Sequence, residues 1–89
     1  MKKTKELERI VKGCANHRRI EALALLEREP ELTLEEIADE LSINFRTASE
    51  HMRRMVVGGL IMKRYEGTAV RHALTDRGKT IFSFLRSLV

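Results

Sequence analysis

Four side chains between positions 46 and 53 have the types and the spacing to bind hydrogen-bonding groups of a partner. They are Arg46, Ser49, Glu50 and Arg53. Steps of three and four residues place side chains on one face of a helix. Arginine presents several donors in a fixed fork, serine donates and accepts, and an ionised glutamate only accepts. An alternative interpretation stays open, in which Arg46, Glu50 and Arg54 form i, i+4 ion pairs on a solvated face.

The second half of the chain carries most of the positive charge. Residues 42–89 have nine basic and three acidic side chains, whereas residues 14–41 have three basic and eight acidic ones, and the whole chain has a net charge of +4. Lys63, Arg64 and Arg71 belong to the basic half and are suited to bind phosphate groups. A polyanion such as nucleic acid or an acidic membrane surface would be attracted to this half. Ordinary solubility is the alternative role for these three side chains.

The composition gives no support for catalysis or for a metal or cofactor site. The sequence has no nucleophile paired with a base and no glycine loop for phosphate, so we do not expect an enzyme. Cys14 and His17 have a spacing that a metal can use, but two ligands do not make a site, and Cys14 continues an apolar stripe. Whether the pair has a sensing role stays open. A single cysteine and the absence of a long apolar run favour a cytoplasmic protein with no membrane partner.

The elements that must position these residues are mostly helical. Eighty-nine residues allow one small domain, which we expect to span residues 1–89. Apolar spacing predicts helices over about 5–14, from a cap at Asn16 to about 28, over 34–41, and over about 45–57. In the second helix we expect Ile20, Leu23, Ala24 and either Leu26 or Glu27 to face the core. Thr33 and Glu36 form a capping-box pattern.

Asn44 is the expected cap of the helix over about 45–57. In that helix Ala48, Met52 and Met55 are spaced by four and three residues, so we expect them to face inward.

The spacing of the apolar residues changes after the fourth predicted helix. Segments 60–65 and 70–75, separated by Glu66-Gly67-Thr68-Ala69, predict a β-hairpin. Asp76 is the expected cap of a last helix over about 77–89. The predicted order is therefore helix, helix, helix, helix, strand, strand, helix: a mostly α fold with a small β-hairpin.

This order, together with local motifs, resembles the winged helix-turn-helix transcriptional regulators, especially the ArsR-type (arsenic-repressor-like) family. Residues 36–52 are similar to the family's helix, turn and "S-x-x-T-V-S-x-H-L" recognition helix, with Thr47, Ser49 and His51 at matching positions. The family's wing pattern is matched by Gly59-Leu60-Ile61, Glu66-Gly67 and Leu74-Thr75. The metal-sensing Cys-x-Cys of the family is replaced by Thr33 and Glu35, so a metal site is not implied.

The resemblance implies a sequence-specific regulator that binds double-stranded DNA, most simply as a repressor. The helix over about 45–57 would enter the major groove, where Arg46, Ser49, Glu50 and Arg53 would contact bases. Thr47 would bind a phosphate or pack at the turn. The wing, over about 60–75, would place Lys63, Arg64 and Arg71 on the backbone. A winged-helix module that binds another protein instead of DNA is the alternative.

The first and last helices carry more apolar surface than one small domain covers. We therefore expect them to form a homodimer, which would place two recognition helices on a near-palindromic site. The expected dimerisation residues are Leu7, Ile10, Val11, Ile81, Phe84, Leu85 and Leu88.

Overall fold

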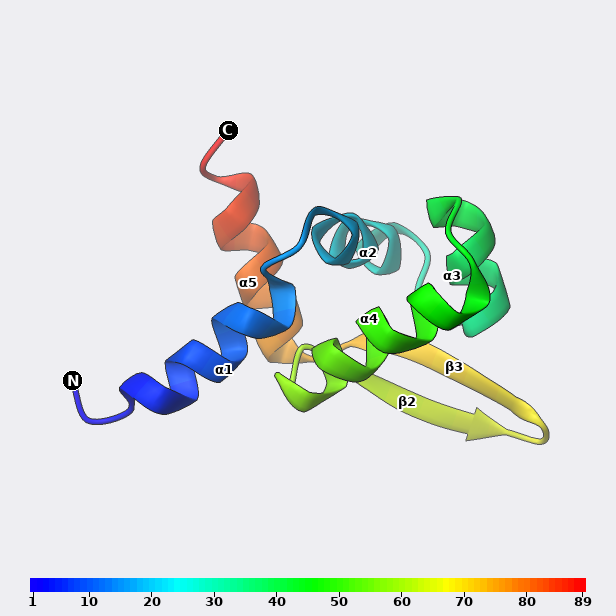
Figure 1. Cartoon of the computed structure of the whole chain (residues 1–89), viewed down its shortest axis with the longest axis horizontal. Helices are drawn as coiled ribbons and strands as arrows, with labels where there is room; N and C mark the ends of the chain where they lie inside the picture. The colour runs from blue at the N-terminus through cyan, green and yellow to red at the C-terminus, as the bar shows by residue number, and fades with distance from the viewer.

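The computed structural model describes residues 1–89 and contains five helices and three strands (Figure 1). In chain order the elements are α1 (Thr4–Cys14), α2 (His17–Arg28), β1 (Leu32–Thr33), α3 (Leu34–Leu41), α4 (Phe45–Val57), β2 (Ile61–Glu66), β3 (Ala69–Leu74) and α5 (Asp76–Arg86). The mostly helical class and the predicted order of four helices, a β-hairpin and a last helix are confirmed. α4 lies between α1 and the long hairpin formed by β2 and β3 (Figure 1).

The sheet has one strand more than the sequence predicted. Its order is β1-β3-β2, with both pairings antiparallel. β1 has only two residues, Leu32 and Thr33, which pair with His72 and Arg71 of β3. Two residues are too few to show an alternating pattern, which explains why β1 was missed. This short strand ties the hairpin to the helices before it.

The core forms between α2, α3, α4 and the base of the hairpin. Ala48, Met52 and Met55 form the inner stripe of α4, and none of the three is more than 1% exposed. Met52 and Met55 join a cluster that includes Leu23 of α2 and Ile37 of α3. The inward orientation predicted for this stripe is confirmed, so the opposite side of α4 faces solvent.

Side-chain caps define where several helices begin. Asn16 accepts hydrogen bonds from two backbone amides of α2, and Thr33 and Glu36 form the predicted capping box. At α5 the predicted cap was wrong. Thr75, and not Asp76, is the N-cap residue, because its Oγ1 accepts from the amide of Gly78 at 3.0 Å and also donates to the carbonyl of Gly59 at 2.6 Å.

Three further expectations need correction. Ile20 is exposed, and Ala22 and Leu25 are buried in its place, so the core face of α2 is rotated from the predicted stripe. The turn of the hairpin is shorter than predicted, since β2 extends through Glu66 and β3 begins at Ala69. The last helix ends at Arg86 rather than at position 89.

Much of the apolar surface of α1 and α5 stays uncovered in the single chain. Phe84 of α5 and Leu88, just beyond its end, are 59% and 63% exposed, and Leu7 and Val11 of α1 are exposed as well. The remaining residues of the expected dimerisation set, Ile10, Ile81 and Leu85, are partly buried against the core.

We predict that Gly78→Ala destabilises the fold although alanine favours helix formation. A Cβ at this position would lie 2.0 Å from the carbonyl oxygen of Leu60, which is backbone and cannot move aside cheaply. Overpacking of this kind costs about 1–3 kcal/mol, more than the roughly 1 kcal/mol that alanine gains over glycine in a helix. We expect a thermal melt several degrees lower than that of the wild type. Ser83→Ala, an exposed position in the same helix, is the control; equal melting temperatures for the two variants would contradict the prediction.

Candidate nucleic-acid interface

The outward face of α4 carries the four side chains expected to contact bases. Arg46, Ser49, Glu50 and Arg53 are all exposed and lie opposite the buried stripe of the helix. The helix begins where the side chain of Asn44 accepts a hydrogen bond from the amide of Thr47 at 2.8 Å. Because this cap and the core packing fix both the start and the rotation of α4, the four side chains form one ordered polar surface.

The ion pairs of this surface match only in part the alternative interpretation of the sequence, in which Arg46, Glu50 and Arg54 form i, i+4 pairs. Glu50 pairs with Arg53 at 2.7 Å and with Arg54 at 3.0 Å, whereas Arg46 has no ion pair. The hydrogen bonds from Arg53, together with the charge of Arg54, lower the pKa of Glu50 to about 2. Glu50 is therefore a carboxylate at neutral pH and an acceptor already in use. Arg46 is the arginine of this face whose donors are free.

Lys63 lies on the face of the hairpin that packs toward α3 and α4. Side chains alternate along a strand, so Lys63 shares this face with Ile61 and, across the register, with His72. An open groove of about 420 Å³ separates this face from the start of α4. The groove is lined by Thr33, Leu34, Glu35, Phe45, Lys63, Thr68, Ala69, Val70 and His72. Lys63 forms no ion pair and is exposed beside the groove.

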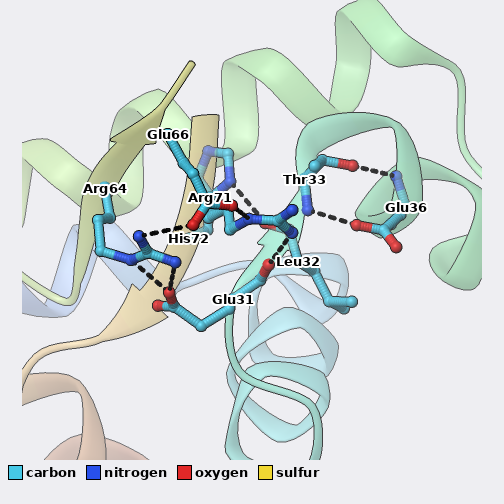
Figure 2. A network of polar contacts seen from close by, with 8 residues as sticks. All are labelled: Glu31, Leu32, Thr33, Glu36, Arg64, Glu66, Arg71 and His72. Carbon is cyan, nitrogen blue, oxygen red and sulfur yellow. Dashed lines mark hydrogen bonds and ion pairs between the residues drawn. The ribbon is translucent and has the colours of Figure 1, made fainter. Parts of the chain in front are cut away.

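Arg64 and Arg71 point to the other face of the hairpin, where two glutamates hold them (Figure 2). Arg64 pairs with Glu31 and, at 3.4 Å, with Glu66. Arg71 pairs with Glu66 at 3.0 Å and donates to the backbone carbonyl of Glu31 at 3.1 Å. The hydrogen bonds from Arg71 and Arg64 lower the pKa of Glu66. Their positive charges are thus partly balanced within the chain, unlike that of Lys63.

The same network anchors the hairpin to the loop that precedes α3. Glu31 has a left-handed backbone conformation with φ +72, and its amide donates to the carbonyl of His72 at 3.0 Å. His72 is 2% exposed and its Nδ1 lies 3.1 Å from the carbonyl oxygen of Leu32. Burial lowers the pKa of His72. The neutral ring therefore serves as a packed link between β3 and β1.

Cys14 and His17 do not come together with further ligands. Cys14 is buried, its Sγ donates to the carbonyl of Val11 at 3.4 Å, and burial raises the pKa of its thiol. His17 is exposed at the start of α2. No group of three or more His, Cys, Asp or Glu side chains is placed to hold a metal ion.

Sequence reasoning overlooked two basic residues that lie next to the end of α4. Arg9 and Lys12 of α1 line a hollow together with Arg53 and Arg54. The excess of basic residues in the first segment of the chain was the only sign of them, because nothing in the sequence predicts that α1 packs against α4. None of the helices has the length and apolar character required to span a membrane.

Comparison with protein families identifies the central part of the chain. A model of winged helix-turn-helix DNA-binding domains matches residues 16–62, which include α2, α3, α4 and the first residues of β2. A comparison with curated protein sequences finds no match.

Solved structures show the same arrangement over nearly the whole chain. The homodimeric winged helix-turn-helix DNA-binding domain of a possible ArsR-family transcriptional regulator from Mycobacterium bovis has a TM-score of 0.88 and 29% identity, covering 96% of this chain and 79% of that one. HlyU from Vibrio cholerae has a TM-score of 0.84 and 26% identity, covering 98% and 95%. NolR from Sinorhizobium fredii, at 17% identity, shares the fold with a TM-score of 0.86, covering 97% and 86%.

Proposed function

The chain belongs to the winged helix-turn-helix DNA-binding family, and we propose that it is a homodimeric, sequence-specific repressor of the ArsR type. The observation that carries this proposal is the outward face of α4, an ordered polar surface on a helix whose other side is buried. A helix of this kind fits the major groove, and its first two turns reach the base edges. Repression then requires only that the bound dimer block a promoter.

Arg46 is the principal base-reading residue in this proposal. It lies in the first turn of α4, is exposed and has no ion pair, so its fork is free to donate to O6 and N7 of a guanine. Ser49 is exposed one turn further along and completes the reading surface. Glu50 and Arg53 are paired with each other, so this ion pair must open before either side chain contacts a base. Opening an exposed ion pair costs little free energy. Thr47, at the turn, is assigned to a phosphate.

The hairpin contributes backbone contacts of two kinds. Lys63 lies beside α4 and has no carboxylate partner, so it is the first phosphate contact of the wing. Arg64 and Arg71 are on the opposite face, where they are paired with Glu31 and Glu66. They bind phosphates when a phosphate group replaces the glutamate carboxylate as their partner. Such contacts raise affinity and its dependence on salt without selecting a sequence.

The uncovered apolar surface of α1 and α5 supports a homodimer. Phe84 and Leu88 are among its most exposed large side chains. The similar domain from Mycobacterium bovis is homodimeric. A two-fold dimer would present two copies of α4 to half-sites about 34 Å apart, one turn of DNA.

The DNA-binding role predicts that Arg46→Ala and Lys63→Ala weaken binding in different ways. For Arg46→Ala we expect a loss of about 1–3 kcal/mol that is largest on the preferred sequence. For Lys63→Ala we expect a similar loss on all sequences and a salt slope smaller by about one for each protomer, or about two for the bound dimer. The measurement is a fluorescence titration at several salt concentrations, with duplexes recovered from genomic fragments that the wild type retains and with scrambled duplexes.

Lys79→Ala is the matched control, because it removes one exposed positive charge from α5, away from the proposed interface. Wild-type binding that is absent or insensitive to salt would contradict DNA binding and favour the protein-interaction alternative.

The dimer proposal predicts that Leu88→Glu yields a folded monomer. A charge placed on this exposed apolar residue costs little in the single chain but opposes burial between two chains. Light scattering after size-exclusion chromatography at tens of micromolar should give twice the chain mass for the wild type and one chain mass for the variant. Tyr65→Glu, at an exposed position of the hairpin, should stay dimeric. A monomeric wild type would rule out the proposed dimer.

A further inference from the structure

We infer that α1 forms a second phosphate-binding flank of the DNA interface, through Arg9 and Lys12, at the opposite end of α4 from the wing. This inference rests on the proposed function and adds a contact region to it. The ligand is the sugar-phosphate backbone of the same duplex that α4 reads.

Two glycines allow α1 to approach α4 closely enough to form this region. A Cβ on Gly13 of α1 would lie 3.3 Å from the Cα of Gly58, the residue at the end of α4. The two backbones therefore cross with almost no side chain between them. The basic side chains of both helices meet beside the crossing in a hollow of about 300 Å³, which is lined by Glu8, Arg9, Lys12, Gly13, Arg53, Arg54 and Val57.

A buried arginine holds the end of α1 in place. Arg19 of α2 is 9% exposed, and its Nη1 donates to the carbonyl of Lys12 at 2.9 Å and to that of Gly13 at 3.4 Å. Free carbonyls at a helix end need such donors. Because Arg19 is anchored in the body of the domain, the crossing of α1 over α4 is rigid, and Arg9 and Lys12 are fixed relative to the reading helix.

The charges of the hollow match a phosphate. Four cationic side chains line it, of which Arg53 and Arg54 are paired with Glu50 on α4, and Glu8 is the single carboxylate among its lining residues. Glu8 pairs with Lys12 at 3.5 Å, but both are well exposed, so this pair is weak. Arg9 has no ion pair. Val57 is the one hydrophobic residue in the lining, so the hollow does not suit an apolar ligand.

The hollow is continuous with the DNA-reading surface. Arg53 belongs both to the outward face of α4 and to the lining of the hollow. A duplex that lies along α4 therefore passes the hollow at one end of the helix and the groove beside Lys63 at the other, because Phe45 at the start of α4 lines that groove. Figure 1 shows α1 and the turn of the hairpin at opposite ends of the molecule, with α4 between them.

The phosphate contact and the proposed dimer use different sides of α1. At 100° per residue, Arg9 and Lys12 project away from Leu7 and Val11, which are the exposed apolar residues of the helix. One helix can therefore contact the partner chain and the DNA backbone at the same time.

The test is a salt titration of the full chain carrying Arg9→Ala and Lys12→Ala together. Each phosphate contact contributes about 0.9 to the slope of log affinity against log salt. The proposed dimer has two such contacts in each protomer, so we expect the slope to fall by about 3.6 and the affinity advantage of the wild type over the variant to shrink by roughly a hundredfold between 50 and 200 mM salt. The loss should be equal on a retained genomic duplex and on a scrambled duplex, leaving the ratio between them unchanged.

The matched control carries Arg28→Ala and Lys79→Ala, which remove the same charge from exposed positions outside the hollow. Equal slopes for the two double variants would overturn the inference while leaving the proposed function intact, provided that Arg46→Ala still weakens binding. If the wild type itself shows no salt-dependent binding, both the inference and the proposed function fail. Melting curves for both double variants establish that the fold is unchanged.

Discussion

Burial of the inner stripe of α4 is the constraint on which the interface depends. Ala48, Met52 and Met55 are enclosed by the core, and burying a methionine side chain contributes about 1.5–3 kcal/mol. The exposed ion pairs on the outer side contribute little to stability, because solvent screens them. Packing therefore decides the rotation of the helix, and the outward position of Arg46 follows from it. The Asn44 cap then sets where the helix begins. α1 and the hairpin of β2 and β3 pack against α4 in this fixed orientation.

The exposed arginines differ in how available they are to DNA. Arg53 and Arg54 share Glu50, while Arg64 and Arg71 are held by Glu31 and Glu66 (Figure 2). Arg46, Lys63 and Arg9 have no such partner. In this account the unpaired cations make the first contacts, and the paired arginines add to them where a phosphate replaces a carboxylate. In the proposed complex, each of these carboxylates must be displaced before its arginine contributes to binding.

Sequence patterns predicted the parts of the fold that depend on local chemistry. The Asn16 and Asn44 caps, the Thr33–Glu36 box and the inner face of α4 could be read from residue types and spacing. Contacts between distant segments could not. Three such contacts depend on tertiary packing, which leaves no periodic signal in the sequence. They are the strand pairing of Leu32 with His72, the ion pair between Glu31 and Arg64, and the close approach of Gly13 to Gly58. The Thr75 cap was missed because Asp76 is an equally good capping residue by type.

Amide chemical-shift mapping of the ¹⁵N-labelled chain, titrated with a duplex that it retains from genomic fragments, would locate the DNA interface residue by residue. We expect the largest changes to follow the outward side of α4, with Arg46 and Ser49 foremost, and to extend to Lys63 at one end and to Arg9 and Lys12 at the other. The amides of α2 should change least. Changes confined to α2 and α3, with α4 unaffected, would contradict the assignment of α4 as the helix that reads DNA.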